Sequence, residues 1–194
     1  MTVLATAAVA VTAASAALLG GSMSPATDTA RTQVGRATAA TRAAPTVTVN
    51  LRTSSTPLSR CFPNARSQVT VVLTTDSLGK DAFTIRAWGL RAKTDFTVFL
   101  IEQATPTFGA AEYIGDFTTN QQGRAVNTFT LIVEEAFAFN NTKHSRTDLN
   151  SIGFWFADPK DDNGCLGKGS PVTGFDGDAS AGVQMMNSGN RKLP

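Results

Sequence analysis

The sequence predicts an all-β protein, built as an antiparallel β-sandwich of seven or eight short strands. Short segments rich in Val, Ile, Thr and Phe alternate apolar and polar residues with the period of two that is typical of strands. Turn-forming residues separate these segments about every dozen residues, as in sandwich domains. A helical period of 3.6 residues is hard to find after Pro45. A closed barrel is the main alternative architecture.

Seven segments carry the strand pattern, and an eighth near the C-terminus is short. The segment 96–101 is apolar on both faces, which predicts a strand in the middle of a sheet. We expect 113–133 to form a hairpin that turns at 120–123, where Asn, Gln and Gly cluster. Single helical turns are expected at 134–140 and 146–150. In chain order, the eight segments are 46–51, 69–74, 83–88, 96–101, 113–117, 128–133, 152–157 and 183–186.

Residues 1–26 predict a secretory signal peptide with a helical apolar core. This segment is Ala-rich and uncharged, and Ser24 and Ala26 supply the small residues that a cleavage site requires. The alternative is a membrane anchor, for which the run is weakly apolar, since about 30 Å of hydrocarbon must be spanned. Residues 27–46 are mostly Ala, Thr and Arg and predict a disordered, flexible leader. The folded β-sandwich domain is therefore expected at 47–194, in a secreted protein that contacts a membrane only through an uncleaved signal segment.

The distribution of charge excludes one class of partner. Residues 28–46 hold three Arg and one Asp, which leaves fourteen basic and fourteen acidic residues in 47–194. A neutral domain lacks the basic surface that a phosphate backbone requires. We therefore expect no binding to nucleic acid.

The two cysteines predict one disulfide. Cys61 and Cys165 both stand in polar, turn-rich segments, and an exported chain meets an oxidising compartment. The bond would close a loop of about a hundred residues, for which chain-entropy models give about 4 to 5 kcal/mol of stabilisation. A catalytic or metal-binding thiol is less favoured, because there is no Cys-x-x-Cys pair and His144 is the only histidine.

One acidic loop carries a candidate calcium site, the only cofactor that the sequence suggests. Asp158, Asp161, Asp162 and Asn163 supply side-chain oxygens just before Gly164. Calcium takes six to eight oxygen ligands, and loops of spaced Asp and Asn with a Gly supply them. The EF-hand spacing is absent, and the same residues are typical of solvated turns, which is the alternative interpretation.

Three aromatic residues are candidates for ligand binding. Trp88, Trp155 and Tyr113 would form a stacking platform for sugar rings if they shared a solvent-facing side. Packing in the core is the alternative. A carbohydrate-binding module, assisted by calcium, is therefore one functional hypothesis.

An enzyme is a further alternative with weaker support. A glycoside hydrolase needs two carboxylates about 5 to 10 Å apart across a cleft. Glu134 and Glu135 are adjacent, so on a strand they would point to opposite faces. The segment 144–148 contains His, Ser and Asp, but catalytic triads take their members from separate elements. We therefore name no catalytic residue.

The stretch 89–123 resembles secreted β-sandwich modules. Gly89-Leu90, the run 94–100, the run 114–120 and Gly123 resemble the layout of immunoglobulin-like and chordin-type domains. The resemblance implies a sandwich architecture and an extracellular setting, and it transfers no catalytic residue. The sequence thus favours an exported, non-catalytic binding or surface-associated module for an extracellular ligand, glycan or protein. A carbohydrate-binding module and a glycoside or ester hydrolase are the alternatives.

Overall fold

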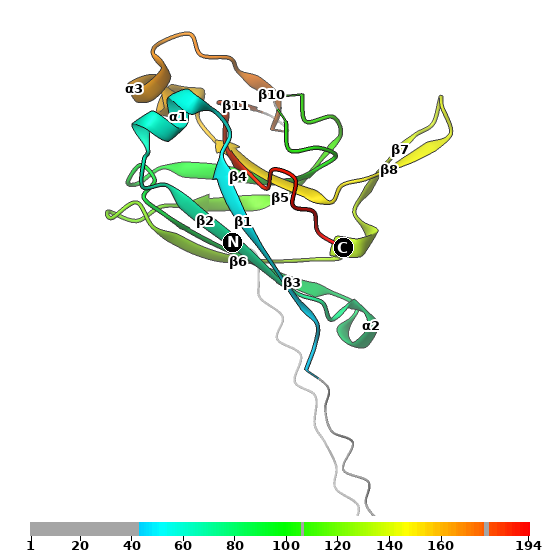
Figure 1. Cartoon of the computed structure of the whole chain (residues 1–194). Coiled ribbons are helices and arrows are strands. Elements are labelled where there is room, and N and C mark those ends of the chain that lie inside the picture. The colour runs from blue at the N-terminus through cyan, green and yellow to red at the C-terminus, as the bar shows by residue number, and fades with distance from the viewer. Residues whose placement is uncertain (1–42, 106, 177–178) are drawn as a thin grey trace, which may run out of the picture. The chain divides into compact units, whose positions relative to one another are not determined.

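The computed structural model describes residues 43–105, 107–176 and 179–194, and eight of its strands form one antiparallel sheet (Figure 1). The order across the sheet is β5-β4-β9-β12-β1-β2-β3-β6. Each strand overlaps a segment expected from the period-two pattern, so the all-β antiparallel class is confirmed. The strands are β1 (Thr46–Thr53), β2 (Arg66–Val72), β3 (Asp81–Trp88), β4 (Asp95–Ile101), β5 (Ala111–Thr118), β6 (Ala125–Leu131), β9 (Ser151–Phe156) and β12 (Gln184–Asn187).

The sheet has two halves that share β1. Residues 46–51 of β1 pair with β2, whereas Arg52 and Thr53 at its end pair with β12. The two edge strands return toward each other, since Asn127 Nδ2 on β6 donates a hydrogen bond to the Asp116 carbonyl on β5 at 3.1 Å. The sheet therefore curls around its core. This arrangement lies between the sandwich and the closed barrel that the sequence predicts as its alternative.

The main core lies between the two halves of the sheet. Inward-facing residues such as Val69, Phe83 and Ile85 are fully buried. The Phe96 ring stacks on Phe117 with centroids 5.3 Å apart. Burial of each such side chain contributes about 1.5 to 3 kcal/mol, so this core is the main source of stability.

The half of the sheet that contains β9 is covered on its outer face as well. Trp155, Phe99 and Ile101 point away from the main core and form a second buried cluster with Ala181. Ala181 belongs to a separate small sheet of β10 (Thr173–Asp176) and β11 (Ala179–Ala181), and Phe108 packs on the cluster from a loop. Strand β4 is consequently buried on both faces, and it is an interior strand, as predicted, although it lies next to the edge strand β5.

Short helices and a second small hairpin complete the fold. The helices are α1 (Thr56–Cys61), α2 (Thr75–Leu78) and α3 (Asn163–Leu166), with 3-10 turns η1 (Val133–Glu135) and η2 (Pro159–Asp162). Helix α1 is too short to show a period, but it has a local start signal. The Ser55 hydroxyl accepts from the Leu58 backbone N–H at 3.4 Å, and Pro57 stands in the first turn.

The helical turn expected at 134–140 is right only for Glu134 and Glu135, and the one expected at 146–150 is wrong. The chain forms η1 and then the hairpin of β7 (Phe137–Asn140) and β8 (Ser145–Asp148). A local turn explains the hairpin. The Asn140 side chain accepts from two backbone N–H groups, and His144 adopts a left-handed φ of 49° that closes the turn.

The expected hairpin over 113–133 has the right turn and the wrong pairing. The Asn120 side chain accepts from Gln122 and Arg124 N–H, and Gly123 has φ 65°. Strand β5 pairs with β4, however, and β6 pairs with β3. A Cβ at Gly123 would lie 2.0 Å from the Leu90 carbonyl oxygen, so this turn packs tightly on the β3–β4 connection and bridges the two halves of the sheet.

The predicted signal segment 1–26 lies outside the described residues, as does the leader 27–46 up to residue 42. Strand β1 begins at Thr46, one residue before the expected start of the domain. In the part of the chain that the structure describes, no helix has the length and apolar character needed to cross a membrane.

Candidate functional site

The disulfide between Cys61 and Cys165 joins two short helices at one end of the sheet. Cys61 ends α1, Cys165 lies in α3, and their Cα atoms are 5.8 Å apart. Figure 1 shows the two helices side by side. Leu58 of α1 and Leu166 of α3 line the same cavity. The predicted pairing of the cysteines is present, and it fixes two walls of this cavity.

The cavity is largely apolar and has a volume of about 240 Å³. This volume is below the range of about 300 to 1,000 Å³ that is typical of sites for drug-sized ligands, so it suits a short alkyl chain or a single ring. Its polar lining consists of Ser54, Ser55, Thr173 and Gln184. Its apolar lining consists of Leu58, Phe108, Trp155, Leu166, Pro171 and Val183.

A polar groove of about 430 Å³ continues from the cavity. Ser54 and Ser55 line both, so the two spaces adjoin, and we call them together the α1 cleft. Arg52 lines the groove, is exposed, and has no ion-pair partner among the described residues. Its guanidinium lies over Gly189, where a Cβ would be 2.8 Å from Arg52 Cζ. The polar end of the α1 cleft thus presents an uncompensated cation.

A hydrogen bond connects the groove with the cavity. Asn187, which lines the groove, donates from Nδ2 to Gln184 Oε1 at 2.8 Å, and Gln184 lines the cavity. Gln184 is 9% exposed, and its Nε2 has no hydrogen-bond partner in the described part of the chain. An unpaired buried donor costs about 1 to 3 kcal/mol. This nitrogen is inaccessible to solvent, so the Gln184 amide forms a fixed part of the wall.

The structure does not bring together the three aromatic residues that the sequence proposes for ligand binding. Trp155 is 1% exposed, packs edge-on against Phe99 and Phe108, and borders the α1 cleft. Trp88 and Tyr113 are exposed on β3 and β5, in different halves of the sheet. No shared stacking platform forms. The loop carrying Phe108 covers Trp155 on the outer face of β9, and the other two residues lie on separate halves of the sheet. A binding role of the individual residues stays a prediction.

The carboxylates of the acidic loop are engaged within the protein. Asp162 is fully buried and accepts hydrogen bonds from the Ser170 hydroxyl and from the Val183 N–H at 3.1 Å. Asp158 caps η2 by accepting from the Lys160 N–H at 2.8 Å. Asn163 begins α3. This loop therefore holds the segment at Val183 against the α1 cleft.

Asp161, the remaining residue of the candidate calcium site, faces Arg91. The two side chains form an ion pair at 3.5 Å. Burial raises the pKa of the Asp161 carboxyl, Arg91 opposes the rise, and the nearby Asp158, Asp95 and Asp162 carboxylates add to it. Within the described ranges, no three His, Cys, Asp or Glu side chains gather as metal ligands. Calcium binding stays a prediction.

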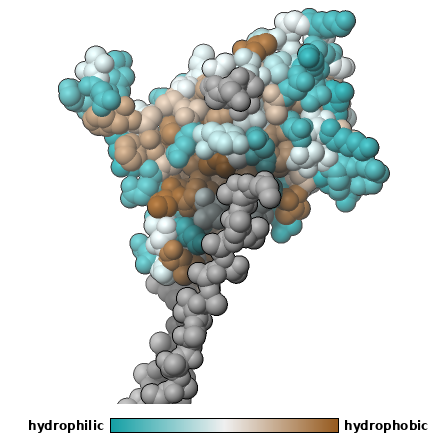
Figure 2. Space-filling model, turned by 180° about the vertical axis from the view of Figure 1, so that it is seen from behind, coloured by the Kyte–Doolittle hydropathy of each residue, from teal (hydrophilic) through white to brown (hydrophobic). Residues whose placement is uncertain are grey.

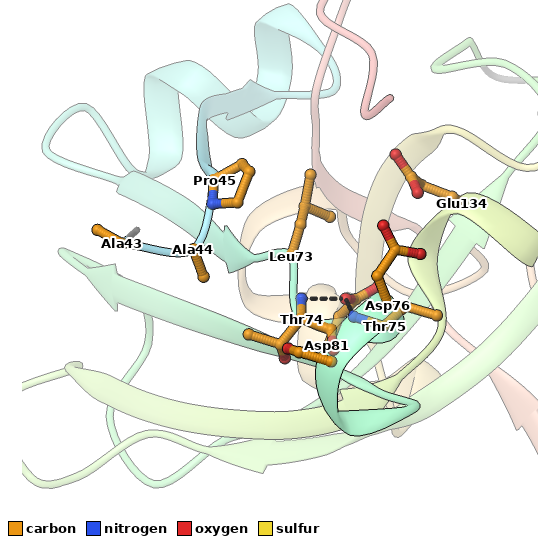
Figure 3. Close-up of a pocket in the computed structure, with 10 residues that line it drawn as sticks. Ala43, Ala44, Pro45, Leu73, Thr74, Thr75, Asp76, Asp81 and Glu134 are labelled. Atoms are coloured by element: carbon orange, nitrogen blue, oxygen red, sulfur yellow. Dashed lines mark hydrogen bonds between the residues drawn. The ribbon is translucent and has the colours of Figure 1, made fainter. Parts of the chain in front are cut away.

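Glu134 and Glu135 line different pockets. Glu134 shares a pocket of about 380 Å³ with Asp76 and Asp81 near the start of β1 (Figure 3), whereas Glu135 lines a pocket at the β5–β6 edge. Asp81 is 1% exposed and accepts from the backbone N–H groups of Thr74, Thr75 and Val133 at 2.8, 3.0 and 2.9 Å. Burial acts to raise the pKa of Asp81, but these hydrogen bonds outweigh it and lower the pKa. Asp81 is thus a charged structural acceptor.

Comparisons of this chain with protein-family models, with curated proteins and with solved structures found no match. The resemblance to immunoglobulin-like and chordin-type modules accordingly stays a prediction. In the structure, its stretch 89–123 forms β4, β5 and the turns around them.

Apart from Trp155, sequence reasoning missed the residues that build the α1 cleft. One local signal was available, since the hydroxyl-rich run Ser54-Ser55-Thr56 before Pro57 is typical of a helix start. The convergence of Arg52 with Asn187 depends on the pairing of β1 with β12. A pattern within one strand carries no information on its partner strand.

Proposed function

We propose that this chain is an exported, non-catalytic binding module whose ligand occupies the α1 cleft. One observation carries this proposal: the apolar cavity and the polar groove adjoin at Ser54 and Ser55. Ligand sites are typically apolar spaces with a few placed polar groups. The ligand class that fits the α1 cleft is a small amphiphile.

The lining of the α1 cleft indicates how such a molecule would lie. Its apolar part would pack beside Leu58 and Trp155, away from water. Its polar or anionic head would lie in the groove, where the Arg52 guanidinium can donate hydrogen bonds to a carboxylate.

The groups that line the α1 cleft favour binding over hydrolysis. They are hydroxyls, amides and one guanidinium, which hold polar atoms of a ligand. Hydrolysis of a glycoside or ester calls for a positioned carboxylate or imidazole. The carboxylates of Asp76 and Glu134 line a different pocket.

Export rests on two supports. A disulfide persists in oxidising compartments, and Cys61, which is exposed, would meet reductants elsewhere. The residues 1–26 have the composition of a signal peptide. A secreted location follows as part of the proposal.

The binding proposal is tested by titrating the full chain with alkyl carboxylates from hexanoate to decanoate, and with the alcohols of the same length. Trp155 borders the cavity, so its fluorescence reports occupancy in a Trp88→Phe background, where it is the remaining one of two tryptophans. We expect the carboxylates to bind more tightly than the alcohols. Arg52→Gln should remove that preference and leave alcohol binding unchanged.

Arg86→Gln is the matched control, because Arg86 is also an exposed arginine on a strand and lies on β3. This variant should bind the carboxylates and the alcohols as tightly as the unchanged chain does. A Trp155 signal that responds to neither series contradicts the proposal. Saturable binding of oligosaccharides alone would favour the carbohydrate-binding alternative, and its loss with a chelator would favour calcium assistance.

A further inference from the structure

The hairpin of β7 and β8 stands apart from the eight-stranded sheet. It forms a two-stranded sheet of its own, and Figure 1 shows it projecting from the body of the domain. We call residues 137–148 the arm. An isolated two-stranded hairpin is only marginally stable in water, so a projecting arm with apolar side chains gains from a partner that covers it.

One face of the arm carries two exposed phenylalanines. Phe137 and Phe139 are 43% and 52% exposed, and they share a face because they lie two residues apart on a strand. The opposite face is half-buried at Ala138 and Thr147. The Arg146 guanidinium lies 4.3 Å from the centre of the Phe137 ring. Figure 2 shows apolar surface at the root of the arm and a hydrophilic tip.

Charge changes sign along the arm. Lys143 lies in the turn at the tip. Glu135 precedes β7 at the root, and together with Glu112 of β5 it lines a pocket of about 470 Å³ that includes Ile132. Neither Lys143 nor Glu135 forms an ion pair with another described residue. The tip is therefore basic, and the root is acidic with an apolar pocket beside it.

We propose that two copies of this chain associate through their arms, packed antiparallel. In this arrangement the basic tip of each copy meets the acidic root of the other, and Phe137 and Phe139 of both copies are covered. Such an interface is isologous, because the same surface serves both copies. A parallel arrangement would oppose like charges, which fixes the direction.

A second copy fits the arm better than an unrelated surface does. The arm and its root present a basic end, a middle in which Phe137 and Phe139 lie beside the Arg146–Asp148 ion pair, and an acidic end. The same surface turned by two-fold symmetry presents these parts in reverse order. An anionic lipid surface would match Lys143 but would repel Glu135 and Glu112. Among the described strands, β7 and β8 pair only with each other, so each has an outer edge that a second arm can meet.

The proposal is tested by sedimentation velocity on the full chain over a concentration series. We expect a dimer that dissociates on dilution. Phe139→Ser should weaken dimerisation by about tenfold or more, since a central aromatic residue dominates an interface. Leu78→Ser is the matched control, because Leu78 is 66% exposed on α2, and it should leave the dimer unchanged. Equal melting temperatures, measured where each variant is monomeric, show that both variants fold.

A charge exchange separates contacts between copies from contacts within one copy. Lys143→Glu and Glu135→Lys should each weaken dimerisation, because each variant opposes like charges at both tip-to-root contacts. An equimolar mixture of the two variants restores opposite charges at both contacts and should dimerise as the unchanged chain does. A chain that stays monomeric at every concentration overturns the proposal. So does a dimer that survives Phe139→Ser, or a mixture that associates no better than its components.

Discussion

The walls of the α1 cleft are held by several parts of the chain, whereas the arm depends mainly on its own ladder and on its root. A disulfide joins α1 to α3, Trp155 packs in a buried cluster, and Asn187 orients Gln184. On the arm, Phe137 and Phe139 remain exposed. A preformed cleft suits a small ligand, because few side chains have to be ordered when the ligand binds. An exposed apolar arm suits a macromolecular partner.

The largest effect is expected from removing the disulfide. Cys61→Ser with Cys165→Ser should lower the free energy of unfolding by up to about 4 to 5 kcal/mol, because the unfolded chain loses a cross-link that closes a long loop. Binding of octanoate should be lost, since two walls of the α1 cleft separate. Dimerisation through the arm should persist below the lowered melting temperature.

Urea unfolding of the double variant measures the loss, and the unchanged chain in reductant is its control. Reductant should destabilise the unchanged chain and leave the double variant unaffected. If the double variant binds octanoate as tightly as before, the disulfide does not hold the cleft.

A smaller effect is expected from truncating one aromatic residue in each region. Trp155→Ala should cost about 3 to 5 kcal/mol of stability, because it leaves a cavity in a buried cluster. Phe139→Ala should change the stability of the monomer by less than about 0.5 kcal/mol, since its ring is half exposed. Thermal and urea unfolding at low protein concentration measure both. Similar losses from the two variants would remove the contrast between the regions.

The smallest effect is expected from pH at the root of the arm. Asp81 accepts from the Val133 N–H and so holds η1, which leads into the arm, to the sheet. Its pKa in the fold is lowered, so its contribution to stability is present above the ordinary value of about 4 and is lost as the pH falls through the lower value in the fold. Asp76 and Glu134 face the same pocket.

This contribution is measured by comparing the free energy of unfolding of the unchanged chain with that of Asp81→Asn, from neutral to acid pH. Asp81→Asn should be less stable at neutral pH, and the difference between the two should shrink in acid. A difference that stays constant with pH would mean that the Asp81 charge does not anchor the arm.

The strands were predictable because a half-buried strand displays its period of two in the sequence itself. The pairing was not, since β5 and β6 are adjacent in the chain and yet lie at opposite ends of the strand order. The cysteine pair was predictable from composition alone. The arm was missed because Phe137-Ala138-Phe139 is a short apolar run, for which strand and helix cannot be separated by period.

The candidate site was the least predictable part. Trp155 alternates with Phe154 and Phe156 as an outward residue should, but it is covered by Phe108 and Ala181 from distant segments. Arg52 and Asn187 give no local signal, and they meet only through the pairing of β1 and β12. The sequence around Asp162 is typical of an exposed loop, but its carboxylate is buried and accepts hydrogen bonds from Ser170 and Val183.

The most direct test of the binding module is a map of backbone amide chemical shifts of the full chain during titration with octanoate. We expect saturable shifts at Ser54, Ser55 and Gln184 around the α1 cleft, with Phe139 on the arm unchanged. Shifts centred on Trp88 or Tyr113, or the absence of saturable shifts at the α1 cleft, would contradict the proposal.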